Sequence, residues 1–148
     1  MPDATAAPPA LDLPDLDAAY LPVGHMRQIS RVLRLAGPVI EAEVALGADH
    51  WVFPEHFPSD PIFPGALLIE AAGQVVALWA WANGQRGRPR LVRATAAFHH
   101  PVGPEALHIQ LRGEVRRKRH LHFATVELSV LDSHVASVEA VLAVLPPA

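Results

Sequence analysis

The apolar run from Ala66 to Ala82 constrains the fold of this chain more than any other feature. It follows Pro64-Gly65 and precedes Asn83-Gly84, and these pairs suit the start and the end of a helix. The sequence therefore predicts a helix over residues 65–82, roughly 27 Å long at 1.5 Å per residue. A helix that is apolar on all sides has to be buried, in a membrane or in a protein core.

The composition of this run favours a protein core over a membrane. The run is slightly shorter than the ~18 residues typical of a membrane span. It also contains Glu70, Gly73 and Gln74, and a charged group at that depth in a bilayer is costly. We expect a buried core helix and no membrane partner.

Six strand candidates flank the helix. Two precede it, at residues 26–36 and 39–46, and four follow it, at residues 91–98, 107–117, 121–131 and 134–145. Residues 47–64 are predicted to form a proline-stiffened loop and residues 85–90 a basic loop. In the strand at 121–131 the apolar alternation slips near Ala124-Thr125, which predicts a β-bulge there.

Successive hairpins favour an antiparallel sheet, and the sole long helix must be covered by that sheet. The predicted fold is therefore α+β: an antiparallel sheet wrapped around one long central helix, the hot-dog arrangement.

Composition limits the class of protein further. The 148 residues, 51% of them hydrophobic, fit one domain with a real core, at residues 20–148. Residues 1–19 are rich in Ala and Pro and contain four Asp but no Lys or Arg, so we expect a flexible acidic tail. This segment has no features of a signal or transit peptide, which predicts a cytoplasmic protein. The absence of Cys excludes disulfides and a cysteine nucleophile, and the nearly balanced charge argues against a nucleic-acid partner.

Three candidates for the chemistry of a site lie around the start of the helix: Glu70, His56 and the Gly65 N–H. Glu70 and Gln74 share one helix face, and a buried carboxylate with a raised pKa can act as a general acid. A carboxylate satisfied by backbone donors is the structural alternative. His56, on the proline-rich loop, is a candidate base, with a structural histidine as its alternative. The Gly65 N–H lies at the helix N-terminus, where free donors and the helix dipole favour developing negative charge.

The run from His56 to Gln74, HFPSDPIFPGALLIEAAGQ, closely resembles the signature of the hot-dog β-hydroxyacyl-acyl carrier protein dehydratases of fatty-acid synthesis (FabZ-like). The resemblance extends over roughly residues 20–145. It implies that His56 removes the α-proton, that Glu70 assists departure of the β-hydroxyl as water, and that the Gly65 N–H polarises the thioester carbonyl. The glutamate resembles the branch of the family that dehydrates without isomerising. The resemblance implies no cofactor and no metal.

The resemblance also implies partners. The substrate would be carried on the phosphopantetheine of an acyl carrier protein, and each active site would be shared between two subunits of a homodimer, with a higher oligomer or a hetero-oligomer left open. Substrate-binding residues are expected to be Phe57, Phe63, Pro64, Leu67, Gln74 and Phe98. Carrier docking is expected to use basic residues, namely Arg90, Arg93, Arg116, Arg117 and Lys118.

Two other functions compete with the dehydratase. One is an acyl thioesterase on the same fold, in which Glu70 activates water. The other is a non-catalytic acyl-binding subunit of a hetero-oligomer. The presence of both His56 and Glu70 argues against the second, because a pure binding module needs neither.

Overall fold

The computed structural model describes residue 16 and residues 19–148. Its elements are η1 (Gly24–Met26), β1 (Arg31–Ala36), β2 (Val39–Ala45), α2 (Val52–Glu55), α3 (Gly65–Ala82), β3 (Arg88–Phe98), β4 (His108–Lys118), β5 (Leu121–Val130) and β6 (Ser133–Leu145). The predicted tail lies outside the described residues except at Leu16 and Ala19, whose side chains are buried.

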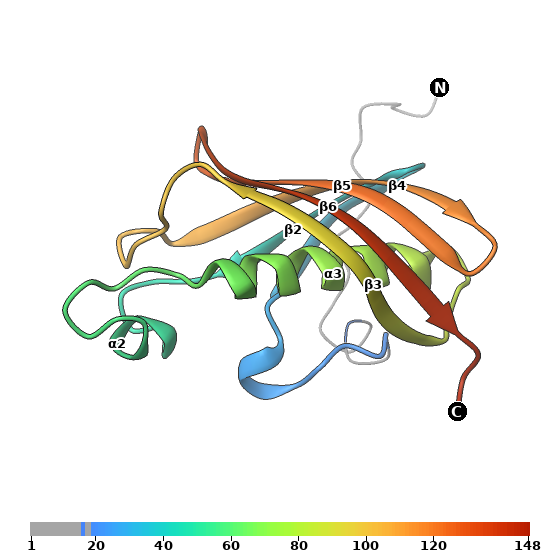
Figure 1. The fold of residues 1–148 in the computed structure, drawn as a ribbon, viewed down its shortest axis with the longest axis horizontal. Coiled ribbons are helices and arrows are strands. Elements are labelled where there is room, and N and C mark those ends of the chain that lie inside the picture. The colour runs from blue at the N-terminus through green and yellow to red at the C-terminus, as the bar shows by residue number, and fades with distance from the viewer. Residues whose placement is uncertain (1–15, 17–18) are drawn as a thin grey trace, which may run out of the picture.

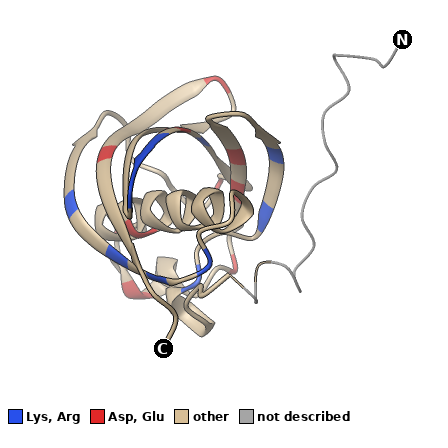
Figure 2. Ribbon diagram, turned by 90° about the vertical axis from the view of Figure 1, so that its right-hand side faces the viewer, with Lys and Arg blue, Asp and Glu red and all other residues tan. Residues whose placement is uncertain are grey.

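The strands form one antiparallel sheet in the order β1-β2-β4-β5-β6-β3. The sheet curves around α3, which runs along its concave side (Figure 1). A view turned by 90° shows the strands surrounding much of the helix (Figure 2). The predicted α+β hot-dog arrangement is confirmed.

Helix α3 begins and ends where its flanking residues predict. Pro64 precedes it in an extended conformation. At the other end Gly84 adopts a φ of 93°, and the N–H groups of Gly84 and Gln85 donate to the carbonyls of Trp81 and Ala80. This is a Schellman C-cap, which needs a left-handed residue after the helix. The helix is long and apolar enough to cross a membrane, yet 61% of it is buried within the protein, as expected of a core helix.

Three boundaries differ from the sequence-based prediction. The loop at 47–64 contains the short helix α2, whose Pro54 lies in the first turn, where proline is tolerated. The first strand starts at Arg31 rather than at residue 26, since Met26 belongs to η1 and residues 27–30 connect η1 to the sheet. Strand β3 starts at Arg88, since the basic stretch 88–90 pairs with residues 143–145 of β6.

The predicted bulge at Ala124-Thr125 is wrong. Both neighbours of β5 keep their register through this point, and the irregularity lies at Leu128/Ser129. The face turned toward α3 consists of every second residue: His122, Ala124, Val126 and Leu128. The prediction of a bulge failed because a polar residue, His122, occupies an inward position, whereas the apolar Phe123 lies on the outer face beside Arg116.

His122 is an unusual core residue. Its side chain is 0% exposed, its ring packs edge-to-face with that of Trp79, and neither ring nitrogen has a hydrogen-bond partner among the described residues. Burial lowers the pKa of His122 below its usual 6.5, and Arg117 and His120 add to this, outweighing nearby backbone groups of Leu142 and His120 that favour the charged form.

A histidine that stays neutral when folded makes stability depend on pH. Below about pH 6.5 the unfolded chain binds a proton that the folded chain does not, so stability falls as the pH falls through this range. We expect His122→Leu to be as stable as wild type, or more stable, at pH 7.5, and to lose less stability between pH 7 and pH 5. Urea unfolding at several pH values measures this. Equal pH slopes in the two proteins would contradict it.

Candidate active site

The loop after α2 holds the His56 ring in a defined orientation. The His56 Nδ1 lies 3.1 Å from the carbonyl oxygen of Ile62. Because that oxygen only accepts, Nδ1 carries the hydrogen and the lone pair is on Nε2. The main chain reinforces this arrangement, since the Ile62 N–H donates to the His56 carbonyl at 2.8 Å. The ring also stacks on Phe57, with 4.1 Å between centroids. His56 is thus oriented as a base that accepts a proton at Nε2.

The start of α3 offers free backbone donors. Gly65 is the first residue of the helix, so its N–H has no acceptor within the helix. The Phe98 ring, which is half-exposed, lies directly against Gly65: a Cβ built there would be 2.9 Å from the ring. A side chain at residue 65 would require the Phe98 ring to move away, so glycine permits this close approach. The structure thus brings together two of the predicted site residues.

Glu70 is half-buried rather than enclosed in the core. Its Oε2 accepts a hydrogen bond of 2.9 Å from the Gln74 Nε2. The carboxyl group is therefore held by a side chain. It is neither the enclosed, unpaired carboxylate nor the carboxylate satisfied by backbone donors that the sequence suggested.

Gln74 itself is 3% exposed and fully engaged. Its Oε1 accepts from the backbone N–H groups of Gln28 and Ile29, at 2.8 and 3.2 Å, and its Nε2 also donates to the Met26 carbonyl at 2.7 Å. Gln74, predicted as a substrate-binding residue, thus connects α3 to the segment before β1 through hydrogen bonds, and it also orients Glu70.

Glu70 and Gln74 lie in a cavity of about 500 Å³. Its walls come from three parts of the chain: the segment before η1, one face of α3, and the start of the edge strand β3 with its neighbour on β6. The lining residues are Tyr20, Leu21, Pro22, Ile69, Glu70, Gly73, Gln74, Ala77, Arg88, Pro89, Arg90, Leu91 and Leu142. His56 is not among them, so within one chain the two predicted catalytic residues do not line a common cavity.

The other predicted substrate-binding residues differ in exposure. Phe57 is 49% exposed, Leu67 is half-buried, and Phe63 is 3% exposed and packs edge-to-face with His50. The sequence reasoning overlooked a cluster of rings at this end of the fold, in which His25 stacks on Trp51 at 4.2 Å. Burial, with a smaller contribution from His25, lowers the pKa of His50.

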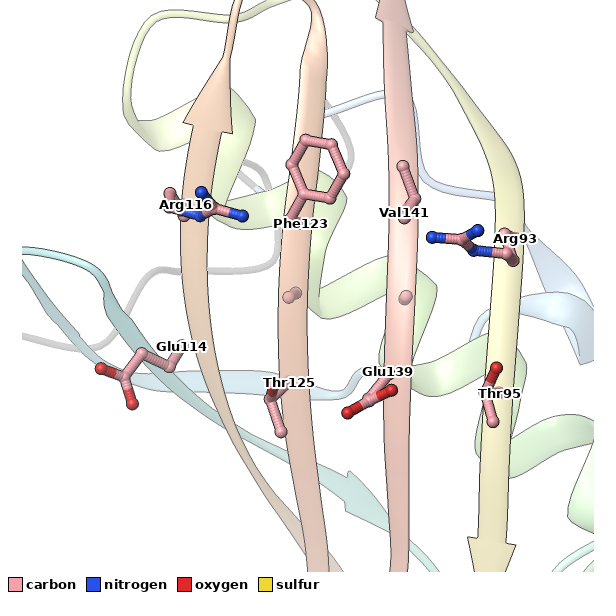
Figure 3. Close-up of a pocket in the computed structure, with 10 residues that line it drawn as sticks. Arg93, Thr95, Glu114, Arg116, Phe123, Thr125, Glu139 and Val141 are labelled. Carbon is pink, nitrogen blue, oxygen red and sulfur yellow. The ribbon is translucent and has the colours of Figure 1, made fainter.

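The five predicted docking residues do not form one patch. Lys and Arg occur on several strands around the helix (Figure 2). Arg93 and Arg116 flank Phe123 and Val141 in a row across the outer face of the sheet, above a second row that contains Glu114 and Glu139 (Figure 3). The other three lie elsewhere: Arg90 lines the Glu70 cavity, Arg117 lines a hollow near the C-terminus, and Lys118 ends β4.

A match to a family model shows the class of protein to which this fold belongs. A family model described as the FabA-like domain matches residues 21–139, well over half of the chain. The chain belongs to the FabA-like domain family.

Solved structures place the fold among both dehydratases and thioesterases. The dehydratase heterocomplex ApeI:P from Xenorhabdus doucetiae contains a chain with a TM-score of 0.73 and 12% identity, covering 88% of this chain and 90% of that chain. A thioesterase superfamily protein from Shewanella loihica PV-4 has a TM-score of 0.56 and 20% identity, with coverages of 76% and 88%. The E. coli PaaI protein from the phenylacetic acid degradation operon has a TM-score of 0.60 and 14% identity, with coverages of 76% and 80%. Identities this low establish the shared fold alone.

Proposed function

We propose that the protein dehydrates β-hydroxyacyl thioesters, carried on acyl carrier protein, to trans-α,β-enoyl thioesters. The observation that carries the proposal is the orientation of His56, whose Nδ1–H is bound to the Ile62 carbonyl so that Nε2 is left to accept a proton. Membership of the FabA-like family and the carboxyl group of Glu70 beside an open cavity support it.

The chemistry follows from these groups. The His56 Nε2 removes the α-proton, and the electron pair moves into the thioester carbonyl to give an enolate. The Gly65 N–H at the start of α3 stabilises the negative oxygen. When the enolate collapses to the C–C double bond, the β-hydroxyl leaves with a proton from the Glu70 carboxylic acid, which gives the enoyl thioester and water.

The separation of His56 from the Glu70 cavity supports a site shared between two copies of the chain. Within the described residues, β3 pairs only with β6, so its other edge is open. Leu91, Val92 and Phe98 on this strand are 47%, 59% and 52% exposed. The strand also carries Arg88, Arg90 and Arg93, but a long open edge with exposed apolar side chains is a template for pairing with another chain. We propose that two copies pair through β3, so that His56 of one copy serves Glu70 of the other.

This arrangement predicts that the dimer and the activity are lost together. We expect Val92→Lys, which places a charge on the open edge, to shift the protein toward a monomer and to lower turnover in proportion. Light scattering after size-exclusion chromatography, run beside the dehydration assay, measures both. The matched control is Leu131→Lys, because Leu131 is 83% exposed in the β5–β6 turn. An active Val92→Lys monomer would contradict the shared site.

A thioesterase is the second candidate, because the Glu70 carboxyl group, held by Gln74, lines an open cavity, and a carboxylate there can act as the base that activates a water molecule. Intact mass spectrometry of β-hydroxyacyl-acyl carrier protein, incubated with the protein, separates the possibilities. Loss of one water, abolished in His56→Ala, establishes the dehydratase. Release of the free acid establishes the thioesterase and overturns the proposal. Bound but unchanged substrate identifies a binding subunit that requires a second chain.

A further inference from the structure

Gly73 is the only glycine in the interior of α3, and neither its backbone nor its packing requires glycine. It is buried, it does not adopt a left-handed φ, and a Cβ built on it would meet no atom within 4 Å. Gly113 on β4 is different, because a Cβ there would lie 3.1 Å from Val75 and 3.2 Å from Ile40. Alanine favours a helix interior more than glycine does. Alanine at residue 73 would therefore fit and would favour the helix, so the packing of the described residues does not account for the glycine.

The space beside Gly73 is the cavity that contains Glu70. Ile69, Gly73 and Ala77 lie at spacings of four residues, so they form one stripe along α3, and all three line the cavity. Leu91 and Leu142 complete an apolar wall. Glu70 therefore lies toward one end of the stripe, and the cavity continues along the helix past the missing side chain.

We propose that Gly73 is a specificity-determining residue that keeps this cavity wide enough for the acyl chain of the substrate. The proposal rests on the proposed function, because it takes Glu70 as the group at the β-carbon. From Glu70 to Gly73 the helix rises about 4.5 Å, the reach of roughly four carbon–carbon bonds. Acyl chains that extend several carbons beyond the β-carbon pass Gly73, whereas a four-carbon acyl group ends before it.

The test adds one methyl group at this position. Gly73→Ala is compared with wild type in calorimetric binding of non-hydrolysable β-hydroxyacyl pantetheine amides with acyl chains of four to fourteen carbons. We expect binding of chains of ten or more carbons to weaken by at least about 10-fold, with four-carbon binding changed less than about threefold. We also expect the melting temperature of Gly73→Ala to rise by about 2 °C, because alanine is the better helix former.

Gly113→Ala is the matched control, since it adds the same methyl group against the opposite side of α3 and outside the cavity. An unchanged chain-length profile in Gly73→Ala, the same change in Gly113→Ala, or a wild-type protein that binds none of the amides would overturn the proposal. If the profile shifts as expected but the wild-type protein forms no enoyl thioester, the role of Gly73 in binding the acyl chain stands and the dehydratase assignment fails.

Discussion

Replacing His56 with alanine is expected to lower dehydration by about 10²-fold or more while leaving the fold intact, because the reaction loses its base. Glu70→Gln is expected to have a similar effect, since the amide retains the shape of the side chain and an acceptor for Gln74 but has no acidic proton to give. The rate of enoyl thioester formation measures both effects. His134→Ala is the control, because His134 lies on the exposed surface, bound to Glu127. Turnover like that of wild type in either site variant would remove the assigned role.

The same two variants test whether the site is shared. If each site takes His56 from one copy and Glu70 from the other, random re-pairing of the His56→Ala and Glu70→Gln proteins gives mixed dimers with one intact site. About one quarter of wild-type activity then returns, because half of the dimers are mixed and one of their two sites is complete. No recovery after verified subunit exchange would contradict the shared site and leave the single-variant result standing.

Replacing Gln74 with leucine is expected to give the largest loss of stability among the substitutions considered. The change removes the acceptor for two backbone N–H groups and a donor to the Met26 carbonyl, all held by a side chain that is 3% exposed. Each buried group left unpaired costs about 1–3 kcal/mol. A total of about 3 kcal/mol corresponds to a melting temperature lower by roughly 10 °C for a chain of this size.

Calorimetry or thermal circular dichroism measures this loss. The matched substitution is Gln110→Leu, because Gln110 is exposed on β4, where such a change is expected to alter stability by less than about 0.5 kcal/mol. A Gln74→Leu protein that melts within about 2 °C of wild type would mean that the segment before β1 is held by other contacts.

Sequence predicted those parts of the fold that depend on local signals. Helix α3 was located to the residue, because Pro64 and Asn83-Gly84 mark its ends and every position from Gly65 to Ala82 is apolar or small, apart from Glu70 and Gln74. Strands β4 to β6 were predicted to within about one residue, since polar turns separate alternating segments. The start of β3 was missed because Arg88 and Arg90 are typical of a solvated loop, and only pairing with β6 makes them part of a strand.

The candidate site divides in the same way. His56, Gly65 and Glu70 were predicted as site residues from one continuous stretch. The contact between Gly65 and Phe98 brings together two residues of the predicted site. The cavity was not predictable, because Tyr20, Arg88 and Leu142 meet Glu70 only through the folded sheet. One local feature of the sequence indicates the cavity: the glycine at residue 73, within a helix whose other interior residues are larger.

The hydrogen bond from His56 to Ile62 has a consequence for how this site tolerates change. The acceptor is a main-chain carbonyl, so every residue type at position 62 supplies it. Variation in side-chain chemistry at that position therefore leaves the imidazole oriented. A single-residue insertion or deletion between residues 57 and 61 displaces the carbonyl, because the turn in which Phe57 and Asp60 bond to each other sets its place. The orientation of the His56 ring therefore depends on the length of this loop more than on the side chain at residue 62.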